Sequence, residues 1–222
     1  MRLFLVTGLL CMGQNPITLV GDSTVAKGGG WGPGLRAALS GTAEVRNLAR
    51  NGRSSKSFRD EGAWKPAIDG TADYVLIQFG HNDCPGNGPD RETDPAATYR
   101  QYLSQYITGA RTAGAAPILA TSMVRRNFAQ NGTIKADCLV PFAGQTRALA
   151  EQTKTPLIDL YSLTRELSER IGPAASEELG AKLADGKPDW THLWPKGQQV
   201  IGAIAAGDLA KIVPVLRTLG PN

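Results

Sequence analysis

Residues 74–79, YVLIQF, limit the fold more than any other stretch. They form a nearly continuous apolar run, which predicts a strand that is apolar on both faces. Such a strand needs cover on two sides, as the central strand of a parallel sheet has. Shorter segments at 17–20, 44–48, 117–121 and 156–160 also read as strands. Segments with helical spacing lie between most of them and after the last, at 31–40, 98–113, 139–153, 163–170 and 196–216. This alternation predicts an α/β fold: a three-layer α/β/α, flavodoxin-like, doubly wound domain with a five-stranded, mostly parallel sheet.

Composition favours one domain. The chain has 222 residues, of which 41% are hydrophobic and 20% charged, enough to bury a single sizeable core. No repeat or charge block divides it, so we expect residues 16–222 to form one domain. The net charge of +4 is small, and basic and acidic residues are interspersed, which indicates neither a nucleic acid nor a membrane partner.

Residues 1–15 predict a separate role for the N-terminus. Arg2 is followed by an apolar run at 3–12, too short to span a bilayer but suited to a secretory signal. The alternative is an N-terminal extension that packs on the domain. We therefore expect a secreted or periplasmic protein, or a cytoplasmic one if residues 1–15 are not a cleaved signal.

The cysteines bear on the same question. Removal of a leader would leave Cys84 and Cys138 of the three cysteines. Two cysteines are compatible with one disulfide in an oxidising compartment, and equally with two separate buried thiols.

Polar loops follow the first three predicted strands. The strand at 17–20 stops at Gly21-Asp22-Ser23, and the next two run into loops that contain Gly52 and Asn82. Open α/β sheets bind ligands at the carboxyl edge, where these loops meet, so Ser23, Gly52 and Asn82 are expected to converge. Ser23 is the candidate nucleophile, although a serine here could simply cap the next helix.

A serine nucleophile needs a base, and the chain has only two histidines. His192 lies in a predicted turn just before the last helix, with Asp189 three residues upstream. That spacing lets the carboxylate reach the imidazole and fix its tautomer. The alternative is a polar turn that only caps the helix.

Taken together, these blocks resemble the SGNH (GDSL-type) hydrolases: GDS at 21–23, Gly52, GHND at 80–83 and DWTH at 189–192. More narrowly, residues 17–216 resemble the rhamnogalacturonan acetylesterase branch of the carbohydrate esterases. The resemblance implies that Ser23 is the nucleophile, His192 its general base and then acid, and Asp189 the orienting carboxylate. It also implies an oxyanion hole formed by the backbone N–H groups of Ser23 and Gly52 and the side-chain amide of Asn82.

The implied activity is a metal-independent serine esterase that works through an acyl-enzyme. Its expected substrate is an acetylated carbohydrate, namely plant cell-wall polysaccharide or oligosaccharide of the rhamnogalacturonan, pectin or xylan type, and no cofactor is expected. One alternative is a broad-specificity esterase of small esters or acetyl sugars. A non-catalytic carbohydrate-binding module would explain exposed tryptophans, but not a serine, an aspartate and a histidine at hydrolase positions.

Four further residues are candidate substrate contacts, and each has a structural alternative. His81 could line the cleft or be a hydrogen-bonded structural donor, while Trp190 and Trp194 could stack on a sugar or pack under their loop. Arg53, with the nearby cations Arg50, Lys56 and Arg59, could meet uronate carboxylates or remain solvated. Asp22 and Asp83 are expected to hold loop amides.

Two other enzyme classes fit poorly. Residues 21–28, GDSTVAKG, approach a phosphate-binding loop, but Ala26 replaces its second glycine and Gly28 its hydroxyl residue. A metallophosphatase or zinc site would need more ligands than two histidines and these isolated cysteines provide.

Overall fold

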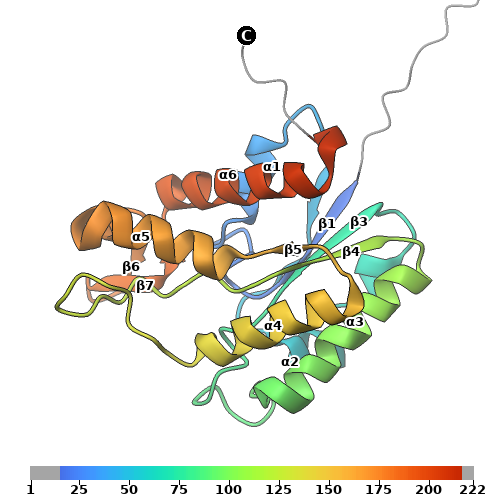
Figure 1. Cartoon of the computed structure of the whole chain (residues 1–222), viewed down its shortest axis with the longest axis horizontal. Coiled ribbons are helices and arrows are strands. Elements are labelled where there is room, and N and C mark those ends of the chain that lie inside the picture. Colours follow the sequence, from blue (N-terminus) through green and yellow to red (C-terminus); the bar gives the residue numbers. More distant parts are fainter. Residues whose placement is uncertain (1–15, 217–222) are drawn as a thin grey trace, which may run out of the picture.

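The computed structural model describes residues 16–216, and at its centre is a parallel five-stranded sheet (Figure 1). The strands are β1 (Ile17–Gly21), β2 (Val45–Asn47), β3 (Tyr74–Gln78), β4 (Ala116–Ala120) and β5 (Leu157–Ile158). Their order is β2-β1-β3-β4-β5, and all four pairings are parallel. The predicted three-layer, doubly wound fold is confirmed.

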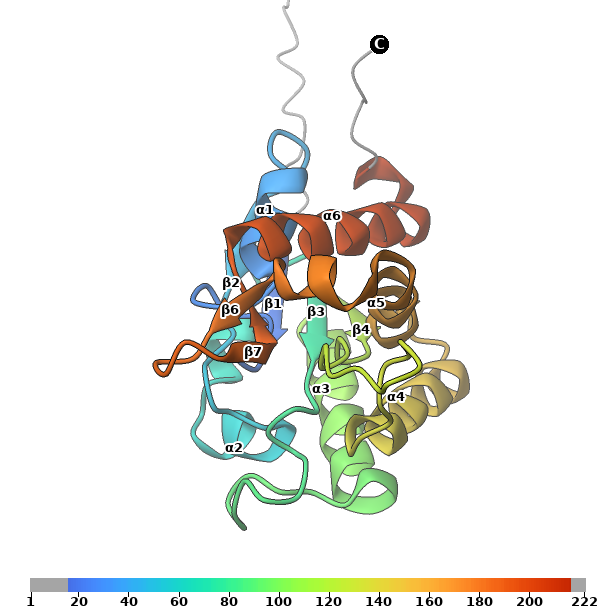
Figure 2. The ribbon, with the colours of Figure 1, turned by 90° about the vertical axis from the view of Figure 1, so that its left-hand side faces the viewer.

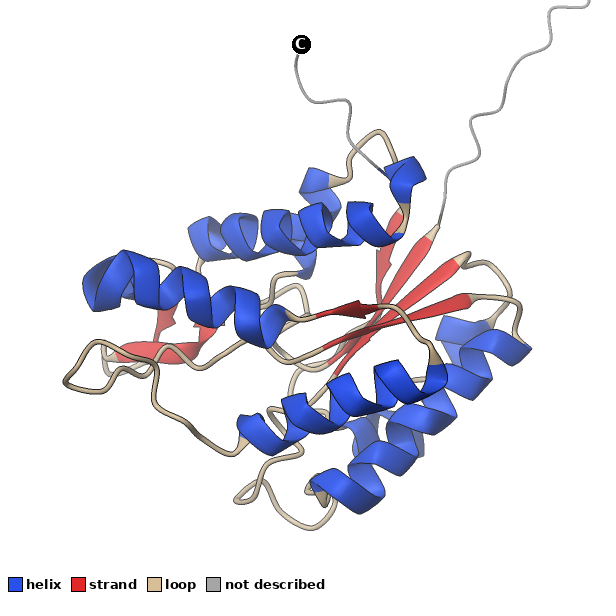
Figure 3. Ribbon diagram, in the orientation of Figure 1, coloured by secondary structure: helices blue, strands red, loops and turns tan. Residues whose placement is uncertain are grey.

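Helices cover both faces of the sheet (Figures 1 and 3). One face packs against α1 (Gly32–Ala38), α5 (Leu160–Glu177) and α6 (Pro195–Ile212). The other packs against α2 (Ser55–Asp60), α3 (Arg100–Thr112) and α4 (Leu139–Thr153). Short helical turns lie at Lys65–Ile68, Pro95–Tyr99 and Pro214–Leu216.

Strand alternation divides the core between the two faces. Along β3, Val75 and Ile77 point into the layer of α2, α3 and α4, whereas Leu76 points into the layer of α1, α5 and α6. All three side chains are fully buried. The apolar run of β3 is thus explained by its position between two helical layers.

Several helix boundaries differ from the prediction. The α5 helix starts at Leu160, directly after its N-cap Asp159, and continues past a kink at Gly172 and Pro173 to Glu177. The last long helix ends at Ile212 because Pro214 cannot continue it. The α2 helix was not predicted, although Ser54 caps it by accepting a hydrogen bond from the backbone N–H of Ser57.

A two-stranded hairpin, β6 (Gly180–Lys182) and β7 (Pro188–Leu193), was also not predicted. Figure 2 shows it near the lower ends of β1 and β3. The predicted turn at 188–194 is wrong, because most of this segment is strand paired antiparallel with β6. The Asp185-Gly186 pair between the strands, with Gly186 at φ 81°, is a hairpin signal that could have revealed it.

Cys84 and Cys138 form a disulfide, with 5.8 Å between their Cα atoms. It joins the loop after β3 to the residue preceding α4. This decides between the two alternatives for these cysteines. The predicted leader at 1–15 lies outside the described residues, and between residues 16 and 216 no helix has the length and apolar character needed to cross a membrane.

Candidate active site

Ser23 lies in the tight turn that follows β1. Gly21, the last residue of β1, has no room for a side chain, since a Cβ would come within 2.5 Å of the Gln78 carbonyl oxygen. Asp22 holds the turn by accepting hydrogen bonds from the Thr24 backbone N–H at 2.8 Å and the Thr24 hydroxyl at 2.6 Å. Asp22 is fully buried while Ser23 is partly exposed, so the turn presents the serine to the site and keeps the aspartate beneath it.

A buried polar network supports this turn. Gln78 Nε2 donates to Thr24 Oγ1 at 2.7 Å, and Trp31 Nε1 donates to Gln78 Oε1 at 2.7 Å. Each link joins a segment of the central sheet to the chain around the serine. Since buried polar groups are costly to leave unpaired, the network favours one conformation of the Ser23 turn.

His192 and Asp189 complete a hydrogen-bonded chain with Ser23. His192 Nε2 lies 2.9 Å from Ser23 Oγ, and His192 Nδ1 lies 2.7 Å from Asp189 Oδ2. The other carboxylate oxygen of Asp189 accepts from the backbone N–H groups of Thr191 and His192. The structure therefore brings Ser23 to the pair formed by His192 and Asp189, although 169 positions separate Ser23 from His192 in the sequence.

The electrostatics of Asp189 suit an orienting carboxylate. Burial acts to raise its pKa, but hydrogen bonds from the backbone and ring of His192 and the backbone of Thr191 outweigh burial and lower it. Asp189 is thus ionised at neutral pH, and an ionised carboxylate favours a proton on His192 Nδ1. Nε2 is then free to accept a proton from Ser23.

Arg126 holds the strand that carries Asp189 and His192, and no pattern in the sequence pointed to it. Its side chain is buried, and Nη2 donates to the backbone carbonyls of Asp189 at 2.8 Å and His192 at 2.6 Å. Its backbone N–H donates to the carbonyl of Trp190. Burial lowers the pKa of Arg126 to about 10, which still leaves it charged at neutral pH.

The second and third loops pack beside the serine turn. The backbone N–H of Arg50 donates to the carbonyl of Gly21, and Asn82 Nδ2 donates to the carbonyl of Arg53 at 3.2 Å. Gly52 has φ +73°, a conformation that favours glycine. The backbone N–H groups of Ser23 and Gly52 donate to no backbone carbonyl in the described chain. These contacts link the three loops that carry Ser23, Gly52 and Asn82.

Asp83 holds a neighbouring loop, in the manner predicted for it. Its carboxylate accepts from the backbone N–H of Ser55 at the start of α2 and from the hydroxyls of Ser55 and Thr93. Burial raises the pKa of Asp83 to about 7. Asp83 is fully buried, so it braces the loops rather than facing the site.

His81 is buried at 5% exposure, which argues against a direct substrate contact. The alternative of a hydrogen-bonded structural donor is wrong as well, because neither ring nitrogen has a partner within the described residues. Its Nδ1 lies 3.8 Å from Asp22 Oδ2, which is also without a partner there. Burial is the main cause that lowers the pKa of His81 well below its usual value and raises that of Asp22.

Trp190 and Trp194 are not packed under their loop. Their exposed fractions are 38% and 50%. Trp190 lies on β7 between Asp189 and His192 in sequence, and Trp194 is the N-cap of α6. Both rings are available to contact a ligand.

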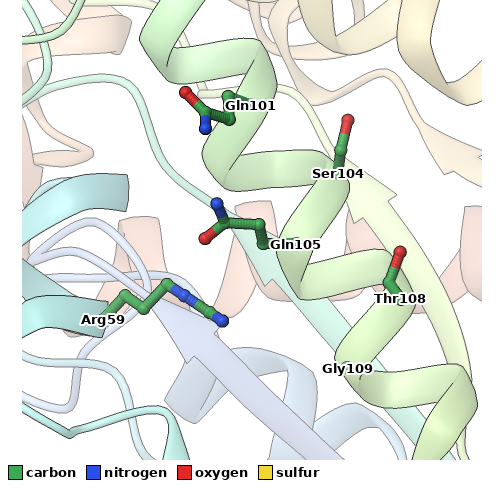
Figure 4. A pocket seen from close by; sticks show the side chains of 6 residues that line it. All are labelled: Arg59, Gln101, Ser104, Gln105, Thr108 and Gly109. Carbon is green, nitrogen blue, oxygen red and sulfur yellow. The ribbon is translucent and has the colours of Figure 1, made fainter.

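The predicted basic group is dispersed. Arg53 forms a salt bridge with Glu61 at 2.8 Å, and Lys56 donates to the carbonyl of Pro89. Arg59 lies in a separate pocket of about 360 Å³ between α2 and α3 (Figure 4). Figure 4 shows Arg59 facing polar side chains of α3, and none of the residues lining this pocket belongs to the loops of Ser23, Gly52 or Asn82. Arg53, Lys56 and Arg59 therefore do not form a uronate site together.

A metal site is not formed in the described part of the chain, where no group of three or more histidine, cysteine, aspartate or glutamate side chains could hold an ion.

The chain is similar to known proteins over most of its length. The model of the GDSL-like Lipase/Acylhydrolase family matches residues 19–200. Rhamnogalacturonan acetylesterase RhgT of Bacillus subtilis is 34% identical over 213 residues, which cover 88% of this chain and 90% of the relative. Probable rhamnogalacturonan acetylesterase YesY of the same organism is 35% identical over 209 residues, covering 90% of each. The crystal structure of the B. subtilis protein YXIM superposes with a TM-score of 0.74 at 26% identity, covering 90% of this chain and 57% of that one.

Proposed function

Because this chain belongs to the GDSL-like lipase/acylhydrolase family and is a carboxylic ester hydrolase, we propose that it removes acetyl groups from pectic polysaccharide or its oligosaccharides, with Ser23 as nucleophile. The observation that carries the proposal is the chain of contacts from Ser23 Oγ through His192 to Asp189, at 2.9 and 2.7 Å. Two relatives whose names specify rhamnogalacturonan acetylesterase support the substrate class.

The first half of the reaction forms an acetyl-enzyme. Ser23 Oγ attacks the acetyl carbonyl carbon while His192 Nε2 takes the serine proton, and Asp189 stabilises the imidazolium. The tetrahedral intermediate then collapses. The bond from the acetyl carbon to the sugar oxygen breaks, and His192 returns the proton to that oxygen.

The second half releases acetate. A water molecule gives a proton to His192 Nε2 and its oxygen attacks the acetyl-serine carbonyl. The ester bond to Ser23 breaks, and His192 returns the proton to Ser23 Oγ. No redox or metal step is required for the atoms to balance.

Three donors would stabilise the negative oxygen in both halves: the backbone N–H groups of Ser23 and Gly52 and the amide of Asn82. An amide nitrogen carries two hydrogens, and Asn82 uses one of them on the carbonyl of Arg53. The second remains for the oxyanion. Loss of one such donor typically lowers turnover about 100-fold or more.

We also propose a cellular location, which is outside the cytoplasm. The disulfide between Cys84 and Cys138 is of the kind that persists in oxidising compartments. It supports export to the periplasm or the medium, where polymeric pectin is accessible.

The proposal is tested with Ser23→Ala and the exposed-serine control Ser40→Ala. We expect Ser23→Ala to lower kcat for p-nitrophenyl acetate about 10⁴-fold or more, since removing the nucleophile costs about as much turnover as removing the whole catalytic unit. Ser40→Ala should match wild type, and wild-type activity should persist with EDTA. Full activity of Ser23→Ala would contradict the assignment of the nucleophile.

Acetate release then identifies the substrate. Acetylated rhamnogalacturonan should be the better substrate than acetylated xylan and small esters on the basis of kcat/KM. Equal rates on all of them would favour the broad-specificity alternative, and binding of polysaccharide without acetate release would favour a binding module.

A further inference from the structure

Arg91 lies beside the glycine that carries one of the proposed oxyanion donors. A Cβ placed on Gly52 would be 3.9 Å from Arg91 Nη1, with no other contact within 4 Å outside its chain neighbours. Gly52 therefore faces open space that is bordered by a guanidinium group. Neither the sequence around Arg91 nor the four motifs of the family resemblance indicated that Arg91 lies beside Gly52.

The loop after β3 holds Arg91 in place. Arg91 Nε donates to the carbonyl of Asn87 at 2.8 Å, and the side chain of Asn87 donates to the carbonyl of Cys84 at 2.8 Å. Glu92 accepts hydrogen bonds from the backbone N–H groups of Gly86 and Gly88. The disulfide of Cys84 anchors the start of the same loop. The direction of the guanidinium is thus fixed by an internally bonded loop.

The charge of Arg91 is not neutralised within the described chain. Between residues 16 and 216, its two Nη atoms donate to no acceptor and no carboxylate lies within 4.0 Å of it. Two other arginines near the site pair with carboxylates: Arg53 with Glu61, and Arg125 with Asp137. Arg91 is partly buried, which weakens solvent screening of its charge.

We infer that Arg91 binds the carboxylate of an acidic sugar in the substrate and so selects uronate-containing esters. A guanidinium presents paired N–H donors that match a carboxylate, and Arg91 has both Nη groups available. The acetyl group would lie at the donors of Ser23, Gly52 and Asn82, with the uronate carboxylate on the Arg91 side of Gly52. This inference rests on the proposed function and assigns to Arg91 the specificity role that the sequence suggested for Arg53.

Two substrates that differ only at the carboxylate test it: a mono-O-acetylated methyl galacturonoside and its uronamide. Wild type should show a KM at least about tenfold lower for the acid, in line with charged hydrogen bonds. Arg91→Gln should raise KM for the acid to that of the uronamide. It should change kcat for the acid by less than about twofold, and likewise kcat and KM for the uronamide. Arg91→Lys should retain part of the preference, and Arg170→Gln, at an exposed helical arginine, should behave as wild type.

The same variants distinguish other roles of Arg91. A loss of kcat shared by the acid, the uronamide and p-nitrophenyl acetate would overturn the inference and indicate a role at the oxyanion or in folding. An unchanged preference for the acid in Arg91→Gln would overturn it as well.

Inhibition separates this inference from the proposed function. Galacturonate should inhibit p-nitrophenyl acetate hydrolysis by wild type at least about tenfold more strongly than galactose, and Arg91→Gln should abolish the difference. If wild type releases no acetate from either sugar, the proposed substrate is wrong, and the inhibition result still decides whether Arg91 binds the carboxylate. Equal inhibition by galacturonate and galactose in wild type would contradict the inference.

Discussion

The positions of Asp189 and His192 depend on one buried cation, Arg126. Its side chain donates to the backbone carbonyls of Asp189 and His192, which lie on one strand, so it fixes the backbone at both members of the hydrogen-bonded pair. Short contacts of this kind matter because catalytic groups must be placed to within a fraction of an ångström. Arg126 acts on the site through these two carbonyls, and we regard it as a positioning residue.

We predict that Arg126→Met lowers kcat about 10- to 100-fold with a much smaller change in KM, because misplacement of His192 affects the reaction more than binding. Arg126→Lys should restore part of kcat, since an ammonium can still donate to one of the carbonyls. The exposed arginine variant Arg165→Met serves as control.

The measurement is kcat and KM on p-nitrophenyl acetate, with the pH profile of kcat/KM and the melting temperature of each variant. A positioning role requires a lower kcat in variants that remain folded at the assay temperature. Wild-type kcat in Arg126→Met would contradict it, and so would a loss of kcat that tracks unfolding alone.

Helices α1 and α6 bring the two ends of the site together. The chain enters α1 shortly after Ser23, and α6 begins just after His192. Their glycines permit close packing: a Cβ on Gly34 would lie 1.8 Å from the Gln198 carbonyl oxygen, and one on Gly202 would lie 2.2 Å from the Gly34 carbonyl carbon. The backbone N–H of Leu193 also donates to the carbonyl of Gly29 at 2.8 Å. The separation of these helices therefore controls whether His192 reaches Ser23.

We predict that Gly202→Ala separates α1 from α6, destabilises the protein by about 1–3 kcal/mol or more and lowers kcat. Gly207→Ala is the matched control on the same helix, because a Cβ there has no contact within 4 Å. It should stabilise the protein by about 0.5–1 kcal/mol, since alanine favours a helix interior over glycine.

Urea unfolding and kcat on p-nitrophenyl acetate check both variants. Equal stabilities of Gly202→Ala and Gly207→Ala would show that the close approach of α1 and α6 is not required.

The whole molecule carries an acid-sensitive group in His81. Burial, and then the charges of Arg125, His192 and Arg126, lower its pKa, while Asp189 acts in the opposite direction. The folded protein therefore keeps His81 neutral at pH values where the unfolded chain protonates it. The contribution of His81 to stability is fully present above its unfolded pKa of about 6.5 and is lost as pH falls below that value.

We predict that wild type loses stability relative to His81→Asn as pH falls, by about 1.4 kcal/mol per pH unit below pH 6.5. Urea unfolding of both proteins between pH 5.0 and 7.5 measures the difference. Asp83 has the opposite sign, because its pKa is raised to about 7 and its contribution is lost as pH rises toward that value. Asp83 is present in both proteins, so its own titration is common to both and cancels in the difference. A difference independent of pH would contradict the buried neutral state.

Local patterns in the sequence determined the five strands, most helices and the loops that carry Ser23, Gly52 and Asn82. Periodicity and strand-end loops are properties of neighbouring residues, so they can be read without a structure. The blocks around Ser23, Asp189 and His192 also allowed their roles to be inferred by resemblance.

Tertiary structure alone decided how residues far apart in the chain meet. Ser23 and His192 are separated by 169 positions, and Arg126 and Asp189 by 63, so no local period records their contacts. The same holds for Arg91 beside Gly52 and for the burial of His81. These features depend on which loops and helices pack against one another, because packing of the whole core sets those distances.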